Sequence, residues 1–395
     1  MMVFGLDPET PPLPEPAPAV SPRQALEAAL LPALARPPCV VAFSGGRDSS
    51  LLLAVAADVA RREGLAPPVP LTLRFPESPT AEESEWQELV IRHIGIDDWL
   101  RQEIHDELDF VGPVAQRTML RHGLLWPANL HFVGPPAAQA AGGSLVTGVG
   151  GDRVLSSGPD DLLGRARVRA NARNLVRGAY RSLPARARAP HHARRVRADA
   201  PWLRAPAVDA VVERLLTEPW EPRHSDARLD HVHRERLHAL TRHGVDLLAK
   251  DEGAHAVIPF LDAGFLASLA NFLGARGIGG RTAVMRKLSG DLLPERLVTR
   301  PTKAVFPEAY CNRHTRDFVR TWPGDGVDDE LVDVERLRAL LGDGTDHRWL
   351  GRSAILIQSA WLAGARSRNA APSGTVRPPP GAEETADDRA RQSTA

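Results

Sequence analysis

Apolar residues follow two kinds of pattern along this chain, and the change from one to the other divides it. In the first part, short apolar and β-branched runs predict strands at 39–43, 69–75, 99–105 and 143–147. Between them, apolar positions at helical spacing predict helices at 23–35, 49–62, 81–93 and 111–122. Strands that alternate with helices of this length predict an α/β fold with a doubly wound parallel sheet, in which ligands bind beyond the carboxyl ends of the strands.

Strand signals stop at about residue 161, and the second half of the chain carries helical patterns instead. These predict helices at 207–217, 227–249, 263–275 and 353–365. At the other end, seven prolines between residues 8 and 22 exclude a regular helix and predict an extended arm. We therefore divide the chain into a Pro-rich arm (1–22), an α/β core (23–160), a helical half (161–368) and a tail (369–395) whose polar composition predicts disorder.

The strongest chemical signal is the loop between the first predicted strand and the next helix, Ser44-Gly-Gly-Arg-Asp-Ser-Ser50. Gly45 and Gly46 lack Cβ, so backbone N–H groups can approach an anion, and the N-terminus of the helix faces the same point. Hydroxyl donors flank the glycines at Ser44, Ser49 and Ser50. Asp48 beside phosphates indicates a divalent cation between them. No Gly-Lys-Ser/Thr closes the loop, so it differs from the other common phosphate loop; an ordinary strand-to-helix turn is the alternative.

A second glycine-rich loop, Thr147-Gly-Val-Gly-Gly-Asp152, follows the last predicted strand of the core. Loops that follow parallel strands lie at the same edge of a sheet, so we expect the two glycine-rich loops to meet there. A nucleotide would then lie between them, with Gly148 beside it. Asp152 either contributes to that site or makes an Asx turn within its own loop.

Composition limits the class of protein. The formal net charge is zero, so no overall field attracts nucleic acid or a membrane surface. No apolar run approaches the roughly 18 residues of a membrane span. Two cysteines, Cys39 and Cys311, are too few for a disulfide framework. We expect a soluble protein of the reducing cytoplasm.

Arginine carries nearly all of the positive charge, because only three of the 49 basic residues are lysines: Lys250, Lys287 and Lys303. Eleven arginines and no acidic residue lie between 165 and 197. This block is either a solvated basic face or a site for an acidic peptide, a carrier domain or RNA. Only one aromatic residue, Tyr180, interrupts it, which makes nucleic acid the weaker of these options.

Four motifs, in this order, resemble those of the synthetase half of class B asparagine synthetases. They are the two glycine-rich loops, Ile258-Pro-Phe-Leu-Asp262, and the segment from Arg286-Lys287 to Arg300-Pro-Thr-Lys303. The resemblance spans residues 24–365, roughly, and extends to β-lactam synthetases, carbapenam synthetase and lasso-peptide cyclases. It implies an adenine nucleotide α-hydrolase-like core with a pyrophosphatase loop, which splits ATP into AMP and pyrophosphate.

The resemblance implies ATP and Mg²⁺ as cofactors and gives the matching residues roles. Asp48 and Asp152 match the family's Mg²⁺ ligands, and Lys303 matches a lysine that contacts the phosphates and stabilises charge in the transition state, unless it is a plain surface lysine. The other residues expected to bind ATP are Ser44, Gly45, Gly46, Ser49, Ser50 and Gly148. Three matches remain open between an active-site and a structural role: Asp262, Arg286 and Lys287.

The chain departs from the family pattern at two positions of the second loop. Asparagine synthetases have glutamates where this chain has Val149 and Arg153, and β-lactam synthetases have a tyrosine at the first of them. A base for the nucleophile must come from elsewhere, or ammonia attacks without one. Candidates near the third motif are Asp251, Glu252 and His255, each of which is also an ordinary helix-end charge.

A further departure concerns the source of nitrogen. Complete asparagine synthetases begin with a glutaminase domain whose nucleophile is an N-terminal cysteine, whereas this chain begins Met-Met-Val. We expect free ammonia, a separate glutaminase partner or an amine within the substrate to supply the nitrogen.

Together these features predict an ATP-dependent ligase that adenylates a small-molecule or peptide carboxylate and transfers it to ammonia or an amine, with release of AMP and pyrophosphate. Three alternatives remain: a lactam- or macrocycle-forming synthetase of a natural-product pathway, an RNA-modifying enzyme with the same loop, and a nucleotide-binding partner without catalytic activity.

Overall fold

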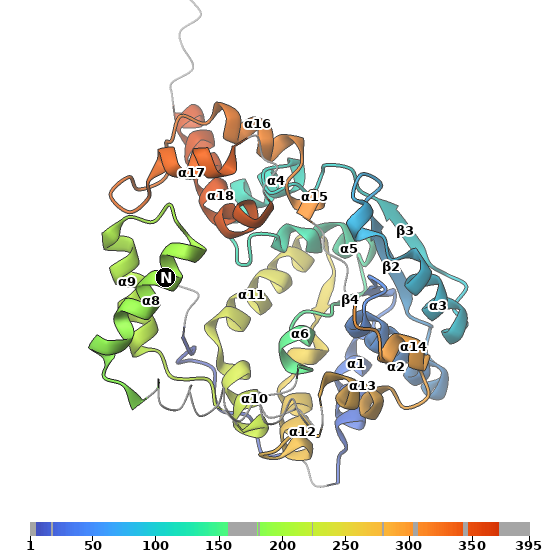
Figure 1. Ribbon diagram of the computed structural model, residues 1–395. Coiled ribbons are helices and arrows are strands. Elements are labelled where there is room, and N and C mark those ends of the chain that lie inside the picture. Colours follow the sequence, from blue (N-terminus) through green and yellow to red (C-terminus); the bar gives the residue numbers. More distant parts are fainter. Residues whose placement is uncertain are drawn as a thin grey trace, which may run out of the picture.

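The computed structural model describes residues 5–16, 19–156, 180, 182–222, 224–278, 280–302, 307–342 and 347–370 (Figure 1). Three sequence-based expectations lie partly or wholly outside these residues. They concern Lys303, the first part of the arginine block and the predicted disordered tail, of which only 369 and 370 are described, at the end of a helix.

A five-stranded sheet forms the centre of the α/β core, and all of its neighbouring strands are parallel. Its order is β3 (Leu100–Glu103), β2 (Val69–Arg74), β1 (Cys39–Ala42), β4 (Ser144–Val146), β5 (His255–Val257). The predicted doubly wound parallel sheet is confirmed. The order reverses between β1 and β4, which are neighbours in the sheet although β2 and β3 lie between them in sequence. Such a reversal is where ligands bind in this class of fold.

Alternate residues of the central strands pack on opposite faces of the sheet. Cys39, Val41 and Val146 contact the helices of one face, chiefly α1 (Pro22–Leu34) and α2 (Arg47–Glu63). Val40 and Leu145 contact the other face, where α5 (Gly134–Gln139) and α11 (Arg236–Asp251) lie. A strand buried on both faces reads as a continuous apolar run, which explains the run at 39–43.

The fifth strand was not predicted. His255–Val257 pairs with β4, with His255 opposite Ser144, so the helical half contributes one edge of the sheet. The expectation that strands end near residue 161 is therefore wrong. A run of three residues is too short to show a periodicity of two, and its pairing with an existing strand decides its conformation.

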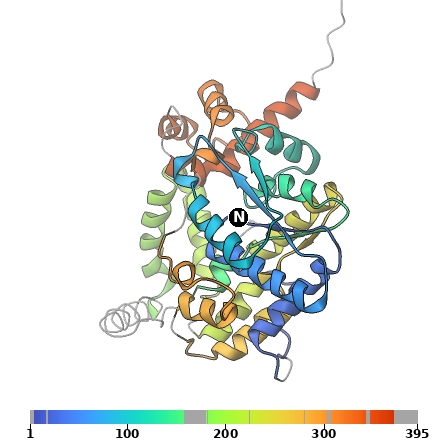
Figure 2. The same cartoon turned by 90° about the vertical axis from the view of Figure 1, so that its right-hand side faces the viewer.

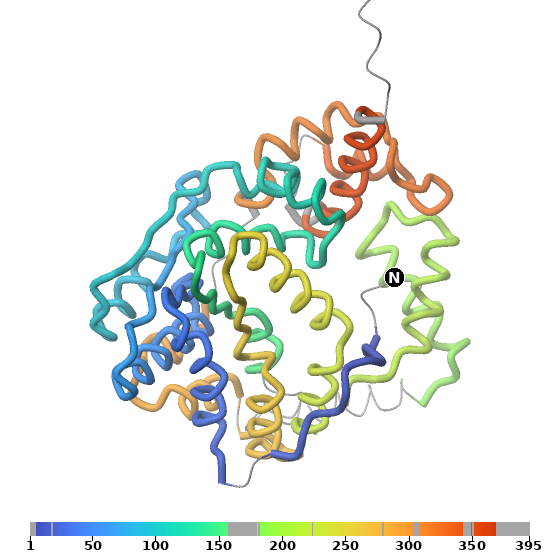
Figure 3. The backbone as a smooth tube through the Cα atoms, turned by 180° about the vertical axis from the view of Figure 1, so that it is seen from behind, coloured from blue at the N-terminus to red at the C-terminus, as the bar shows by residue number. Residues whose placement is uncertain are grey.

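The predicted helix at 227–249 is two helices, α10 (Ser225–Arg234) and α11, separated by Glu235. Glu235 has extended backbone angles, φ −58° and ψ 125°. No glycine or proline marks the break. The N-terminal arm holds it instead, because Asp7 N donates to Arg234 O (2.7 Å) and Arg236 N donates to Gly5 O (2.9 Å). Figures 1 and 3 show the arm beginning near the green helices α8 and α9 and crossing to α1.

The remaining helices surround this core. They are α3 (Ser84–Ile94), α4 (Pro113–His122), α6 (Gly151–Val154), α8 (Ala185–Asp199), α9 (Ala205–Thr217), α12 (Ala263–Leu273), α13 (Arg281–Ser289), α14 (Glu295–Val298), α15 (Pro307–Tyr310), α16 (Arg313–Thr321), α17 (Val334–Leu341) and α18 (His347–Ala370), with 3-10 turns η1 (Pro79–Ala81), η2 (Leu130–Val133) and η3 (Pro259–Leu261). The last three α-helices gather at one end of the molecule (Figures 1 and 2), where a second apolar core contains Trp202, Trp322 and Trp349. Among the described residues, no helix is long and apolar enough to cross a bilayer.

A buried histidine makes the stability of this fold depend on pH. His131 in η2 is 2% exposed, and its Nε2 lies 2.9 Å from the carbonyl oxygen of Leu108. Burial lowers the pKa of His131 to about 4. Below pH 6.5 the unfolded chain takes up a proton that the folded protein excludes, so the stabilisation present above that pH is lost on acidification, by about 1.4 kcal/mol per pH unit down to the folded pKa.

We therefore expect His131→Gln to lose less stability than the wild type between pH 7 and pH 5, by about 2 kcal/mol. Urea unfolding of both proteins at the two pH values measures this difference. Other buried histidines, His233 and His238, also have a pKa lowered by burial, but they are present in both proteins and cancel. Equal losses in the two proteins would contradict the assignment.

Candidate active site

The two glycine-rich loops meet at the carboxyl ends of β1 and β4. A Cβ added to Gly148 would lie 3.8 Å from Ser49 N, so the two loops are separated there by about the width of one side-chain carbon. They form a cavity of about 240 Å³, which also receives side chains from α13 and the segment after α14. Its lining residues are Ala42, Ser44, Gly46, Arg47, Asp48, Ser49, Gly148, Asp152, Arg281, Arg300 and Thr302. The structure thus brings six of the predicted site residues together; Gly45 and Ser50 do not line this cavity.

Glycine is required where the loops pack most closely. Gly45 has φ +82°, and a Cβ there would lie 2.7 Å from Gln87 Cγ. In the second loop, a Cβ on Gly151 would lie 2.7 Å from Asp48 Oδ2. The missing side chain of Gly151 therefore lets the second loop approach Asp48, which brings the two predicted metal-binding carboxylates toward the same cavity.

The first loop is organised by its own serines. Ser44 N donates to Ser49 Oγ (3.2 Å), and Ser49 Oγ donates to Gly46 O (3.2 Å). Gln87 of α3 donates through Nε2 to Ser44 O (3.1 Å). Gly46 is the N-cap of α2 and has no side chain to satisfy the first N–H groups of that helix. The loop therefore presents a helix N-terminus to the cavity, which suits an anion.

Arg281 lies between the two carboxylates. Its Nη1 donates to Asp152 Oδ1 (2.8 Å), and its Nη2 makes a shorter hydrogen bond with Asp48 Oδ1. Burial opposes the charge on Arg281, but the two carboxylates outweigh this effect and raise its pKa. Sequence reasoning missed this residue, because one more arginine at the start of a helix carries no signal in an arginine-rich chain.

The donor set fits Mg²⁺. The described residues contain no group of three or more metal-ligating side chains. Mg²⁺ at nucleotide sites, however, is typically held by only one or two carboxylates together with phosphate oxygens and water. The guanidinium of Arg281 demonstrates that Asp48 and Asp152 together accept a cation, so this pair could hold the metal once phosphates supply the remaining ligands.

A buried ion pair fixes the segment that leads to Lys303. Arg300 and Glu83 are each 5% exposed; Arg300 Nη1 donates to Glu83 Oε2 (2.6 Å), and a second, shorter bond completes a bidentate pair. Arg300 also lies 4.5 Å above the ring of Trp86 and donates through Nε to Thr302 Oγ1 (2.9 Å). The chain immediately before Lys303 is thereby anchored to α3 at the cavity wall. Glu83 was not among the predicted residues.

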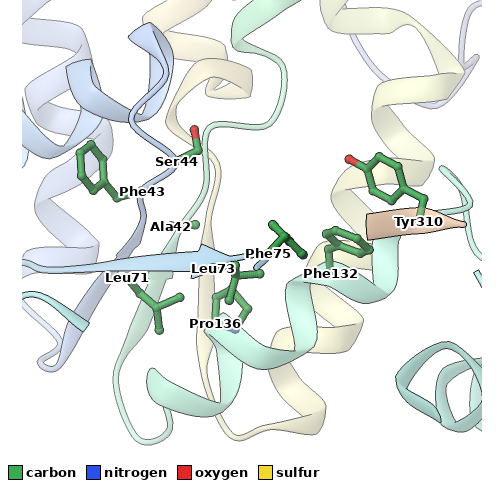
Figure 4. A pocket seen from close by; sticks show the side chains of 9 residues that line it. All are labelled: Ala42, Phe43, Ser44, Leu71, Leu73, Phe75, Phe132, Pro136 and Tyr310. Atoms are coloured by element: carbon green, nitrogen blue, oxygen red, sulfur yellow. The ribbon is translucent and has the colours of Figure 1, made fainter. Parts of the chain in front are cut away.

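An apolar pocket of about 190 Å³ adjoins the polar cavity, and both are lined by Ala42 and Ser44. Its other lining residues are Phe43, Leu71, Leu73, Phe75, Phe132, Pro136 and Tyr310. Figure 4 shows the rings of Phe75, Phe132 and Tyr310 together at one end and Ser44 at the other. The rings of Phe75 and Phe132 stack with centroids 6.2 Å apart. This pocket suits a flat apolar group that continues into a charged one.

Val149 and Arg153, the two residues of the second loop that depart from the family pattern, both contact other parts of the structure. Val149 is half-buried and packs with the apolar residues of η2 and α11, Leu130, Val245 and Leu248, so it contributes no titratable group. Arg153 is paired with Glu235 (2.5 Å) and Glu221 (3.0 Å). Glu235 is the residue that separates α10 from α11.

The three candidate bases lie at the wrong end of the sheet. Asp251 and Glu252 end α11, and His255 begins β5 opposite Ser144, the first residue of β4, whereas the second loop follows the last. Asp251 is also paired with His122 and, at 3.1 Å, with Arg121. These positions favour the alternative interpretation as helix-end charges for Asp251 and Glu252, whereas His255 lies in a strand.

Three residues of the third and fourth motifs, Asp262, Arg286 and Lys287, lie outside the cavity, whereas Arg300 and Thr302 of the fourth motif line it. Asp262 is the N-cap of α12, with Oδ1 accepting from Phe265 N (2.8 Å), which confirms the structural option for this residue. Arg286 is exposed and paired with Glu295 (3.0 Å), and Lys287 lies 5.2 Å from the ring of Phe272. Neither lines the cavity.

The buried pair leads to a stability prediction. We expect Glu83→Gln to destabilise the fold by about 3–5 kcal/mol, because it leaves the charge of Arg300 buried without its partner. The matched control is Glu85→Gln on the same helix: Glu85 pairs with Arg296, both side chains are over 60% exposed, and the expected loss is below about 1 kcal/mol. Urea unfolding measures both losses, and equal small values would contradict the role of Glu83.

Comparison with protein families agrees with this geometry. The family model described as "Asparagine synthase" matches residues 22–363, which include both glycine-rich loops, the whole sheet and the segment that contains Lys303. No curated protein matches the chain significantly. Because the model covers most of the chain, the protein belongs to the asparagine synthase family.

Proposed function

We propose that this protein, as an ATP-dependent amide ligase of its family, adenylates a carboxylate, releases pyrophosphate, and transfers the acyl group to ammonia or an amine with release of AMP. The observation that carries this proposal is the convergence of Asp48 and Asp152 on one cavity at the β1/β4 reversal. The adjoining apolar pocket supports it, because the two spaces together match a nucleotide with a flat base at one end and charged phosphates at the other.

In the proposed complex, the base occupies the pocket between β2 and the aromatic rings of Phe132 and Tyr310. The phosphates lie against the first loop, where the N-terminus of α2 and the Ser44 hydroxyl face them. Asp48 and Asp152 would hold Mg²⁺, which neutralises charge on the departing pyrophosphate. Lys303 follows the anchored Arg300 and supplies a further positive charge to the same group.

The acyl transfer needs no base if the nucleophile arrives as a neutral amine. Val149 lines an apolar wall where related enzymes place a titratable side chain, and this observation favours a product other than asparagine. A substrate that carries both its carboxylate and its amine, giving a lactam or a peptide macrocycle, is therefore our second candidate. In either case the protein acts mainly by holding the two groups together and by stabilising negative charge.

If Asp48 and Asp152 hold Mg²⁺, replacing either of them should weaken nucleotide binding. This effect can be measured without knowing the acyl substrate. We expect Asp48→Asn and Asp152→Asn to weaken binding of the Mg²⁺ complex of α,β-methylene ATP by about tenfold or more, because each removes one charged metal ligand. Isothermal titration calorimetry measures this. Asp246→Asn on α11 is the control, since Asp246 is exposed and pairs only with Lys250 among its described ion pairs. Unchanged affinity in both site variants would refute the assignment.

The proposed role of Lys303 predicts a loss of rate. We expect Lys303→Ala to lower AMP formation about a hundredfold or more while binding of the same analogue changes less, because its charge acts mainly on the transition state. The assay supplies Mg²⁺-ATP with aspartate and ammonium, or with an amino acid or peptide that carries both reacting groups, and detects AMP, pyrophosphate and the amide by mass spectrometry.

The control for this rate measurement is Lys250→Ala, whose side chain is 67% exposed on α11. AMP formation that survives Lys303→Ala would show that another group stabilises the departing pyrophosphate. Nucleotide binding without AMP formation, on every substrate tested, would support the non-catalytic alternative instead.

A further inference from the structure

Arg281 occupies the position that the proposed metal would need. Its two Nη atoms bind Asp48 Oδ1 and Asp152 Oδ1, one oxygen of each carboxylate. The Arg281 and Asp48 side chains are 21% and 16% exposed, so this half of the contact lies mostly away from solvent, whereas the Asp152 side chain is 57% exposed. A guanidinium and a divalent cation cannot share these oxygens at the short distances that Mg²⁺ requires, and their like charges repel.

The position of Arg281 in its own helix is otherwise unfavourable. It is the first residue of α13, directly after the N-cap Gly280, and a positive charge at a helix N-terminus opposes the helix dipole. The two carboxylates therefore account for its placement. Among the described residues, these two carboxylates are the hydrogen-bond partners of the Arg281 guanidinium, which can leave them when a better anion arrives, and a polyphosphate is such an anion.

The charged groups around Arg281 also favour its movement from the two carboxylates to the phosphates of a nucleotide. Arg47 and Arg300 line the cavity with it. Arg300 is already paired with Glu83. Burial and the nearby charge of Arg281 both lower the pKa of Arg47. Among the described residues at the cavity, three arginines thus face Asp48, Asp152 and the buried Glu83, so the formal charges of these six side chains cancel. A metal that entered alone would add two charges beside three guanidiniums.

We propose that Arg281 is a resident cation that closes the metal site until ATP arrives, so that the divalent cation binds together with the nucleotide and not before it. On loading, the metal takes the two carboxylates and the guanidinium moves to the phosphates. Arg281 is therefore a residue that sets the order of binding. This inference rests on the proposed Mg²⁺-ATP site.

The test measures binding of Mn²⁺, whose free ion is counted by electron paramagnetic resonance, with and without α,β-methylene ATP. For the wild type we expect weak binding of Mn²⁺ alone and at least tenfold tighter binding when the analogue is present. For Arg281→Ala we expect Mn²⁺ alone to bind ten- to a hundredfold tighter than to the wild type, because the guanidinium that bridges Asp48 and Asp152 is then absent. The effect of the analogue on Mn²⁺ affinity should shrink accordingly.

Two further variants make the result specific. Arg286→Ala removes an arginine from the same helix, but one that is exposed and paired with Glu295, and it should bind Mn²⁺ as the wild type does. Arg281→Lys keeps a positive charge without the planar fork that reaches both carboxylates, and it should give an intermediate affinity. It also provides the measurement if Arg281→Ala does not fold, as judged by circular dichroism.

The outcomes separate this inference from the proposed function. If the wild type binds Mn²⁺ tightly with the analogue but neither Arg281 variant binds Mn²⁺ alone more tightly than the wild type does, the closing role of Arg281 is wrong and the nucleotide site stands. Equal tightening in Arg286→Ala would also overturn it, since the effect would then come from net charge. If no protein retains Mn²⁺ with the analogue, the proposed function itself fails.

Discussion

The repulsion between two carboxylates governs the architecture of the candidate site. Asp48 and Asp152 follow neighbouring parallel strands, and the absence of a side chain at Gly151 lets the loops that carry them pack together. Two negative charges in a partly buried space need a cation. In this structure Arg281 supplies it from α13, more than a hundred residues further along the chain. The site is therefore joined to the helical half by charge as well as by apolar packing.

A second ion pair ties the same two halves together at the other wall of the cavity. Glu83 is the N-cap residue of α3, and Arg300 comes from the segment after α14. A buried pair is weak evidence for net stability, because the cost of removing both charges from water nearly equals their attraction. What such a pair offers is a defined geometry. Here the bidentate contact and the Trp86 ring fix the backbone just before Lys303, which suits the role on the phosphates that we propose for this lysine.

The α/β core was largely predictable because its signals are local. Buried parallel strands appear as short apolar runs, and the loop Ser44–Ser50 combines glycines, hydroxyls and an acid in one stretch. The elements that were missed depend on distant partners. β5 forms because β4 offers it an edge, and the break at Glu235 exists because the N-terminal arm binds Arg234 and Arg236. Similarly, Arg281 and Glu83 become site residues only through contacts that cross more than 200 positions.

The departures in the second loop bear on the acyl transfer that we propose for this protein. Val149 packs against an apolar cluster of η2 and α11, and Arg153 is paired with Glu235 and Glu221. Neither side chain is therefore suited to remove a proton. The same two glutamates reach the loop from the region where the N-terminal arm meets α10 and α11. A carboxylate at position 153 would have placed a further negative charge against Glu235, whereas Arg153 offsets part of the charge of the two glutamates. The replacement therefore has a structural explanation independent of catalysis.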